Sequence, residues 1–173
     1  FSPGMFDRMY WSLLKRWESC EVAARALQMQ ALSIGILPTV SRDDLRLGNI
    51  SPLSRYHALN DQVFRMRKGD PVRLHIEGRQ TLQHLHEDVM LESAATSLQI
   101  HLQVSSDEVV RAFNTAKILS APLVAVGANS PFFLEHRLWS ETRIPLFEQA
   151  VAVGASDLTK RVTFGLRYAQ DSI

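Results

Sequence analysis

The sequence predicts an α+β fold with a largely antiparallel sheet and helices packed on one face. Alternating polar and apolar residues in 72–77 and 94–104 predict strands, and apolar residues at three- and four-residue spacing predict helices. Neither the dinucleotide-binding pattern GxGxxG nor the phosphate-loop pattern GxxxxGK(S/T) occurs in the sequence. Nothing in it therefore marks a parallel nucleotide-binding sheet.

The first half of the chain should contain two helices and two strands. Helical spacing predicts a helix over 5–27 and another that begins near Tyr56 and ends before Gly69-Asp70-Pro71. Between them, we expect a buried strand over 29–37, because Gly35 and Pro38 interrupt any helix there. A polar loop should follow at 41–54, and the strand at 72–77 comes after the second helix.

The second half begins with residues 80–92, whose pattern fits a strand, a loop or another element. After the strand at 94–104, Ser105 or Ser106 is a plausible N-cap for a helix that ends near Leu119. A second apolar helix should cover 121–128, and a short helix should follow Thr142, with a possible bend near Pro145. The last expected strand covers about 161–166.

Composition narrows the possible classes of protein. The 173 residues are 46% hydrophobic and 21% charged, with a net charge of +1, which fits a single globular domain over 1–173 without an electrostatic reason for a nucleic-acid or anionic-membrane partner. No apolar run reaches the roughly 18 residues of a membrane helix. Cys20 is the only cysteine, which excludes a disulfide framework and fits a reducing, cytoplasmic compartment.

The segment SLQIHLQV, residues 97–104, is the clearest candidate for a functional strand. Ser97, Gln99, His101 and Gln103 share one face, because side chains alternate along a strand. The other face is wholly aliphatic and should be buried, so that Ile100→Ala should cost about 2–5 kcal/mol. The polar face fits either a solvated sheet surface or the wall of a cleft that uses amide and imidazole groups without fixed charge.

Three further groups of residues could carry chemistry. In GANSPFFLEHRLWSETRIPLFEQ, arginines beside aromatic residues suit an anion site, although Glu141 and Arg143 could simply form a surface pair. Arg55 and Tyr56 begin a helix and could attract an anion, or lie on the surface without a ligand. His84 and His86 could bind a metal from one face of a strand, but no third ligand is fixed by spacing.

Three stretches together resemble the glutamate–cysteine ligase family, and its bacterial branch in particular. They are SIGILPTVSRDDLRLGNISPLSRYHALNDQVFRMR, VMLESAATSLQIHLQV and LVAVGANSPFFLEHRLWSETRIPLFEQAV, with a weaker similarity at RVTFG. The resemblance implies a glutamine-synthetase-like catalytic domain that binds ATP, Mg²⁺, glutamate and an amine such as cysteine. It implies phosphorylation of the γ-carboxylate of glutamate and then amide formation, the first step of glutathione biosynthesis.

The resemblance also implies roles for individual residues. Gln99 and His101 should lie on the nucleotide and metal side, with Gln99 as the Mg²⁺ ligand because Mg²⁺ prefers oxygen. Arg143 should be the catalytic cation that faces phosphate or carboxylate. The substrate-binding set should comprise Arg55, Tyr56, Asn129, Ser130 and Glu141.

One feature of the family is not found in the sequence. Family members carry metal-binding carboxylates on an early acidic strand, whereas residues 1–28 here have a helical pattern. We therefore expect the chain to be the middle of a larger ligase catalytic domain and to be inactive in isolation. The alternative is a non-catalytic ligand-binding or regulatory module that keeps the fold without the metal carboxylates.

Overall fold

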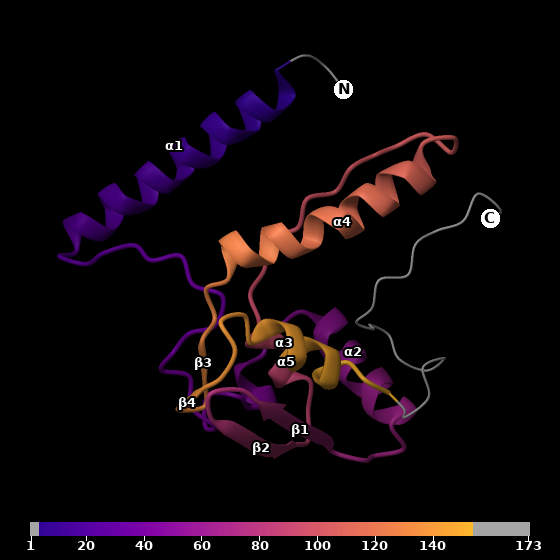
Figure 1. Ribbon diagram of the computed structural model, residues 1–173. Coiled ribbons are helices and arrows are strands. Elements are labelled where there is room, and N and C mark those ends of the chain that lie inside the picture. Colours follow the sequence, from indigo (N-terminus) through magenta and orange to yellow (C-terminus); the bar gives the residue numbers. More distant parts are fainter. Residues whose placement is uncertain (1–3, 154–173) are drawn as a thin grey trace. The chain divides into compact units, whose positions relative to one another are not determined.

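The structure is a computed structural model that describes residues 4–153 (Figure 1). The expected strand at 161–166 lies outside these residues. The chain divides into two compact units, Phe1–Ser33 and Ile34–Ile173. Helices combine with antiparallel strand pairs, so the predicted α+β class is confirmed, but within residues 4–153 the strands form two separate two-stranded sheets and not one large sheet.

The first unit contains helix α1, Met5–Ala26, as the helical spacing predicts. Gly4 precedes it in the left-handed conformation, with φ of 74°. Glu21 accepts hydrogen bonds from Trp17 Nε1 at 2.9 Å and from Arg25 at 3.0 Å, each four residues away. Such pairs stabilise the helix locally, and none of its residues is buried.

The buried strand predicted over 29–37 is wrong. This stretch is irregular, and only Gly35 and Ile36 within it are buried. The Gly35 N–H donates to the Asn129 carbonyl at 3.2 Å, and the Gly35 carbonyl accepts from Thr96 N–H at 3.0 Å. The backbone of Gly35 is therefore satisfied by two separate segments, which replaces the continuous ladder that a strand needs.

Helix α2, Ser54–Met66, follows the expected polar loop, which contains one 3₁₀ turn, η1, at Leu47–Asn49. The antiparallel hairpin of β1, Val72–Glu77, and β2, Thr81–His86, comes next. Burial alternates strictly along β1, as the sequence predicts for this strand. The ambiguous residues 80–92 resolve into β2 and the short helix α3, Met90–Ser93.

A second hairpin joins β3, Phe132–Phe133, to β4, His136–Arg137. Its two turn residues, Leu134 and Glu135, have φ of 46° and 66°, the left-handed pattern of a two-residue hairpin turn. The backbone at Arg137–Leu138 then bonds to the turn between β1 and β2. Gly78 lies so close to it that a Cβ there would come within 2.6 Å of the Leu138 carbonyl carbon.

Helix α5, Arg143–Ala150, packs against β1, as the expected short helix after Thr142. Pro145 occupies its first turn, where a missing N–H costs no helical hydrogen bond. The Gln149 side chain accepts from the His75 N–H at 2.7 Å and donates to the His75 carbonyl at 2.9 Å. The side-chain amide of Gln149 thus satisfies both backbone groups of His75 at the open edge of β1, as a neighbouring strand would.

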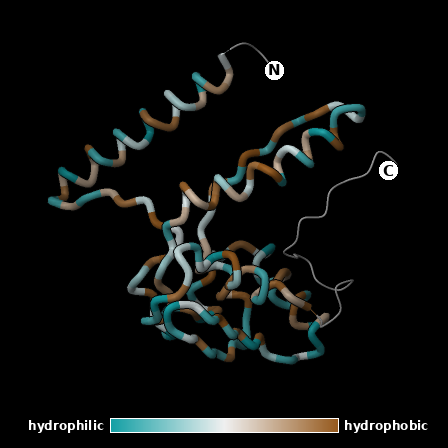
Figure 2. Tube along the Cα trace, in the orientation of Figure 1, coloured by the Kyte–Doolittle hydropathy of each residue, from teal (hydrophilic) through white to brown (hydrophobic). Residues whose placement is uncertain are grey.

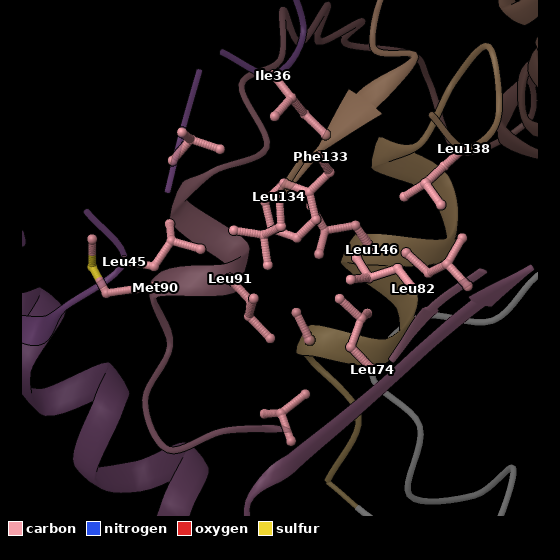
Figure 3. Close-up of a cluster of buried hydrophobic side chains, with 14 residues drawn as sticks. Ile36, Leu45, Leu74, Leu82, Met90, Leu91, Phe133, Leu134, Leu138 and Leu146 are labelled. Atoms are coloured by element: carbon pink, nitrogen blue, oxygen red, sulfur yellow. The ribbon is translucent and has the colours of Figure 1, made fainter. Parts of the chain in front are cut away.

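The hydrophobic core of the second unit lies between the first hairpin, α3, α5 and the second hairpin. Figure 3 shows Phe133 and Leu134 of the second hairpin next to Leu91 of α3 and Leu146 of α5, so that three separate parts of the chain meet there. Phe133, Leu82, Leu91 and Leu146 each have 0% of their surface exposed. The remaining members of the core are Ile36, Val40, Leu45, Val72, Leu74, Ile76, Met90, Leu138 and Ala150.

The strand predicted over 94–104 is also wrong. Residues 95–104 have no regular secondary structure, and Leu98, Ile100 and Leu102 are 75%, 62% and 52% exposed. An alternating segment becomes a strand only where a neighbouring backbone supplies its hydrogen bonds, and within residues 4–153 no strand pairs with it. The alternation therefore indicates a segment that could pair as a β-strand, but among residues 4–153 it has no partner strand.

Because Ile100 is exposed, replacing it by Ala should cost little stability, contrary to the expectation from the sequence. In the chain of this structure, Ile100→Ala should change the free energy of unfolding by no more than about 0.5 kcal/mol, the usual range for exposed positions. Denaturant unfolding of the purified chain measures this difference. A loss of more than about 2 kcal/mol would show that this aliphatic face is buried in solution.

Helix α4, Val109–Gly127, replaces the two helices expected over about 105–119 and 121–128. It is continuous through Pro122, and none of its residues is buried. Figure 2 shows hydrophobic residues along much of its length. By length and composition it could cross a membrane, but one such helix is weak evidence, so the absence of a membrane partner stays a prediction.

Candidate functional site

Four of the residues singled out in the sequence meet where α4 leads into β3 and where α5 begins. We call them the Arg143 cluster: Asn129, Ser130, Glu141 and Arg143. A parallel bridge joins Ser130 to Glu141, with Thr142 N–H donating to the Ser130 carbonyl at 3.1 Å. The backbone itself therefore brings together side chains that are eleven or more positions apart along the chain.

Arg143 is the centre of this cluster. Its Nε and Nη2 donate to the two carboxylate oxygens of Glu141 at 2.6 and 2.5 Å, a bidentate fork. Nη2 also donates to Asn129 Oδ1 at 3.1 Å, and Nη1 donates to the Thr96 carbonyl at 2.7 Å. Four of the five N–H donors of a guanidinium group are thus bound to protein acceptors.

Gly35 allows the guanidinium group to lie where it does. A Cβ at position 35 would come within 2.6 Å of Arg143 Cζ and 2.8 Å of Asn129 Oδ1, closer than side-chain atoms approach. The Gly35 carbonyl also accepts from Thr96 N–H at 3.0 Å and from Thr96 Oγ1 at 2.9 Å. Thr96 is therefore fixed on one side by Gly35 and on the other by Arg143.

The charges in the cluster stabilise each other. Burial alone would raise the pKa of the Glu141 carboxyl, but hydrogen bonds from Arg143 and Ser130 and the positive charge of Arg143 together lower that pKa below its ordinary value. Hydrogen bonding to Glu141 raises the pKa of Arg143 against the opposing effect of burial. The pair is therefore an ionised carboxylate and a guanidinium cation at neutral pH.

This shift predicts a pH dependence of stability. A lowered folded-state pKa means that ionised Glu141 stabilises the fold fully above its ordinary value of 4.5, and that this stabilisation is lost as pH falls through the folded-state pKa. The stability advantage of the wild-type chain over Glu141→Gln should therefore shrink as pH falls below 4.5. Urea unfolding of both proteins from pH 7 to pH 3 measures it.

Glu87→Gln is the matched control for this titration, because Glu87 is an exposed carboxylate outside the cluster. Its stability difference from the wild-type chain should stay small across the same pH range. A wild-type advantage over Glu141→Gln that does not change with pH would contradict the assignment of an ionised, stabilised Glu141.

Two other predicted site residues, Tyr56 and Gln99, line a second feature, which we call the Tyr56–Gln99 pocket. Its volume is about 450 Å³. Tyr56 comes from α2, Glu92 from α3 and Gln99 from the segment that follows Thr96. The other lining residues are Asn49, Ile50, Ser51, Leu59, Val89, Met90, Ser93, Ala95, Ser97 and Phe147.

The remaining two predicted residues lie next to these pocket residues but do not line the pocket. Arg55 donates to the hydroxyl of Tyr56 at 2.9 Å, and its guanidinium group lies 4.8 Å from the centre of that ring. His101 Nε2 lies 3.1 Å from Gln99 Oε1. Arg55, Gln99 and His101 are exposed, whereas Tyr56 is half-buried.

The eight predicted site residues therefore form two groups, and Thr96 connects them. Thr96, which the Arg143 cluster binds, is directly followed by Ser97 and then by Gln99 in the wall of the Tyr56–Gln99 pocket. The cluster thus fixes the start of the segment that presents Gln99 and His101.

Comparison with known families decides where the chain belongs. A model of glutamate–cysteine ligase family 2 matches residues 6–161, which is well over half of the chain. The chain belongs to this family. The match confirms the resemblance deduced from the three sequence stretches, and membership of the family implies a ligase-like enzyme. No curated protein and no solved structure matches the chain.

The structure of this family member adds residues that the sequence argument missed. Gly35 and Thr96 position the segment with Gln99, and Glu92 adds a half-buried acid to the pocket. Gly35 and Thr96 stood within the stretches that resemble the family, but only the fold shows that they contact Arg143. Glu92 lay in the ambiguous residues 80–92, where periodicity gave no signal.

Magnesium, which the family resemblance implies, finds no complete site among residues 4–153. No group of three or more His, Cys, Asp or Glu side chains there is arranged to hold a metal ion. Gln99 offers one amide oxygen, and His101 already contacts it. Mg²⁺ favours six oxygen ligands in octahedral geometry, so the donor set described here does not fit a complete magnesium site.

Proposed function

We propose that the chain forms part of the catalytic domain of an ATP-dependent carboxylate–amine ligase. The reaction joins the γ-carboxylate of glutamate to cysteine in the cytoplasm, as in glutathione biosynthesis. Membership of glutamate–cysteine ligase family 2 supports the class of reaction. The observation that carries the site is that Tyr56 and Gln99 line one pocket whose wall is anchored by the Arg143 cluster.

The proposed reaction has two steps. A γ-carboxylate oxygen of glutamate attacks the terminal phosphorus of ATP, and ADP leaves with the electron pair of the broken P–O bond. The amine of cysteine then attacks the carbonyl carbon of the acyl phosphate, and phosphate leaves as the nitrogen loses a proton. Both steps build negative charge on oxygen, so fixed hydrogen-bond donors and cations are the effective catalysts.

In this proposal the predicted residues divide by position. Arg55 and Tyr56 bind a substrate carboxylate, and Gln99 and His101 contact the phosphate side, with Gln99 offering its oxygen to Mg²⁺. Asn129, Ser130 and Glu141 shape the site by holding Arg143. Arg143 fixes Thr96 through its occupied donors, and its fifth N–H is the one that we propose for a phosphate or carboxylate oxygen.

Variants at polar and apolar positions of the segment 97–104 test the proposal. In the complete protein that contains this chain, Gln99→Ala and His101→Ala should each lower glutamate-dependent ADP release about 10- to 100-fold, because one hydrogen bond to a charged group is worth about 1.5–3 kcal/mol. Ile100→Ala and Leu102→Ala, at exposed apolar positions of the same segment, are the matched controls. Unchanged turnover in both polar variants, with the fold intact, would refute this assignment.

A second candidate function is a non-catalytic ligand-binding or regulatory module. It is favoured by the engagement of four Arg143 donors with protein acceptors, which leaves little of this cation for a substrate. Nucleotide binding measured by calorimetry beside ADP release separates the two. Binding by the complete protein without glutamate-dependent ADP release would support the module and contradict the ligase.

We also propose that the isolated chain does not turn over ATP. The acidic strand that family resemblance places early in the catalytic domain is not recognisable in the sequence. ADP formation from ATP, glutamate, cysteine and Mg²⁺ should therefore equal that of a protein-free control. ADP formation above this control would contradict the proposal.

A further inference from the structure

A basic pocket lies along the β1–β2 hairpin, and it shares no lining residue with the Tyr56–Gln99 pocket. We call it the hairpin pocket. Its volume is about 650 Å³. Its polar lining comes from Arg42, Arg73, His75, Gln83 and His84, and no carboxylate lines it.

The hairpin register places most of these groups. Arg73 and His75 are two residues apart on β1 and therefore point to the same face. Gln83 is the cross-strand partner of His75, so it stands on that face as well. Arg42 reaches the pocket from the loop before η1, so cationic groups approach from two separate segments.

His84 also lines the pocket, although it follows Gln83 and so points to the other face of the hairpin, where a chain of hydrogen bonds orients it. Asp88 Oδ1 lies 2.6 Å from His86 Nε2 and also accepts from Met90 N–H at 2.8 Å, while Oδ2 accepts from Leu47 N–H at 3.1 Å. His86 Nδ1 lies 3.4 Å from His84 Nε2.

The tautomers of the two imidazoles follow from this chain. With His86 neutral, the Asp88 carboxylate accepts from His86 Nε2, and His86 Nδ1 is left as an acceptor. The neutral His84 ring then donates from Nε2 toward His86 and keeps a lone pair on Nδ1.

The permanently charged side chains that line the pocket are all positive. Arg42 and Arg73 carry permanent positive charges, and both are exposed. Burial lowers the pKa of His84, and the nearby His86 and Arg42 lower it further, so that the ring is neutral at pH 7. Two acids lie beside the pocket, Glu77 at 3.4 Å from His75 Nε2 and Asp88 beyond His86.

We propose that the hairpin pocket binds a small phosphate-bearing molecule. A phosphate dianion has three strong acceptor oxygens that point in different directions, which suits donors arriving from a loop and a strand. A carboxylate is planar and is best matched by a single guanidinium fork. This site is separate from the proposed catalytic pocket, so its occupant need not be the ATP consumed in the proposed reaction.

The test uses the whole chain and the NMR signals of its histidines. Inorganic phosphate and pyrophosphate are added at constant ionic strength against chloride, with succinate as a carboxylate dianion. Phosphate should perturb the His75 and His84 signals and raise the pKa of His84 by about one unit, because a nearby negative charge favours the protonated ring. A larger effect of pyrophosphate would indicate an organic di- or triphosphate as the natural ligand.

Substitutions locate the bound ion. Arg42→Gln and Arg73→Gln should each weaken phosphate binding at least about tenfold, the equivalent of one charge-assisted hydrogen bond. Arg65→Gln is the matched control, since Arg65 is an exposed arginine on α2 outside the pocket. Circular dichroism confirms that each variant keeps the fold.

Three results would overturn the proposal: no histidine response beyond chloride, an equal response to succinate, or unchanged binding in both pocket variants. Because none of these readouts involves ATP turnover, failure of the hairpin pocket leaves the proposed ligase function intact. Failure of the ligase function likewise leaves phosphate binding at Arg42 and Arg73 to be judged alone.

Discussion

Replacing Phe133 by Ala should lower the free energy of unfolding by about 3–5 kcal/mol, the usual cost of removing a buried aromatic ring from a packed core. Phe133 is 0% exposed and lies beside Leu134 of the same hairpin, Leu91 of α3 and Leu146 of α5 (Figure 3). The cavity left behind would separate all of these elements. Urea unfolding followed by circular dichroism measures the loss.

The neighbouring Phe132 supplies a matched control on the same strand, because its side chain is 40% exposed. Phe132→Ala should cost much less than Phe133→Ala, since most of the difference comes from burial. Equal losses for the two variants would contradict the core described for the second unit.

Replacing Arg143 by Met should also cost about 3–5 kcal/mol, because it leaves the Glu141 carboxylate without its cation. The Glu141 side chain is only 9% exposed, and it would keep the Ser130 hydroxyl as a donor but lose every hydrogen bond from the guanidinium group. Thr96 and Asn129 would each lose a donor as well. Met keeps much of the volume of Arg, so the loss reports the charge and the hydrogen bonds and not an empty space.

Arg137→Met is the control for this variant, since Arg137 is an exposed arginine on β4. It should change stability by about 0.5 kcal/mol or less. In the complete protein, Arg143→Met should also reduce ADP release, because Thr96 would be held on the Gly35 side only. Full stability and full activity of Arg143→Met would contradict the role of the Arg143 cluster.

Periodicity predicted the elements that are stabilised by their own residues. Helices α1, α2 and α5 and strand β1 all follow the spacing of their apolar residues. Their hydrogen bonds are internal to a helix, or are completed by a partner nearby in the chain, as β2 completes β1. Local sequence is sufficient in such cases.

Elements that depend on distant partners were predicted poorly. The stretch SLQIHLQV alternates as strongly as β1, but within residues 4–153 no strand pairs with it. The second hairpin was missed because its turn uses Leu134 and Glu135 in left-handed conformations, where Asn-Gly or Asp-Gly is the recognisable signal. The burial of neighbouring core residues, and not an intrinsic preference of the two turn residues, keeps the turn in this conformation.

The candidate site likewise combines residues that the sequence predicted with contacts that only the fold shows. The resemblance to the ligase family selected residues on both sides of the site, and the fold brings Asn129, Ser130, Glu141 and Arg143 together. The role of Gly35 could not be deduced, because it depends on a side chain more than a hundred positions away, that of Arg143, which lies 2.6 Å from where a Cβ on residue 35 would stand. The assigned roles of Gln99, His101, Arg55 and Tyr56 stay predictions until they are measured.

The transfer of oxygen from glutamate to phosphate tests the proposed ligase function most directly. The complete protein is incubated with ATP, cysteine and glutamate that carries ¹⁸O in its γ-carboxylate, and the released phosphate is analysed by mass spectrometry. An acyl-phosphate intermediate predicts one ¹⁸O atom in each phosphate, with formation of the amide. Amide formation with unlabelled phosphate, or no amide at all, would contradict the proposed reaction.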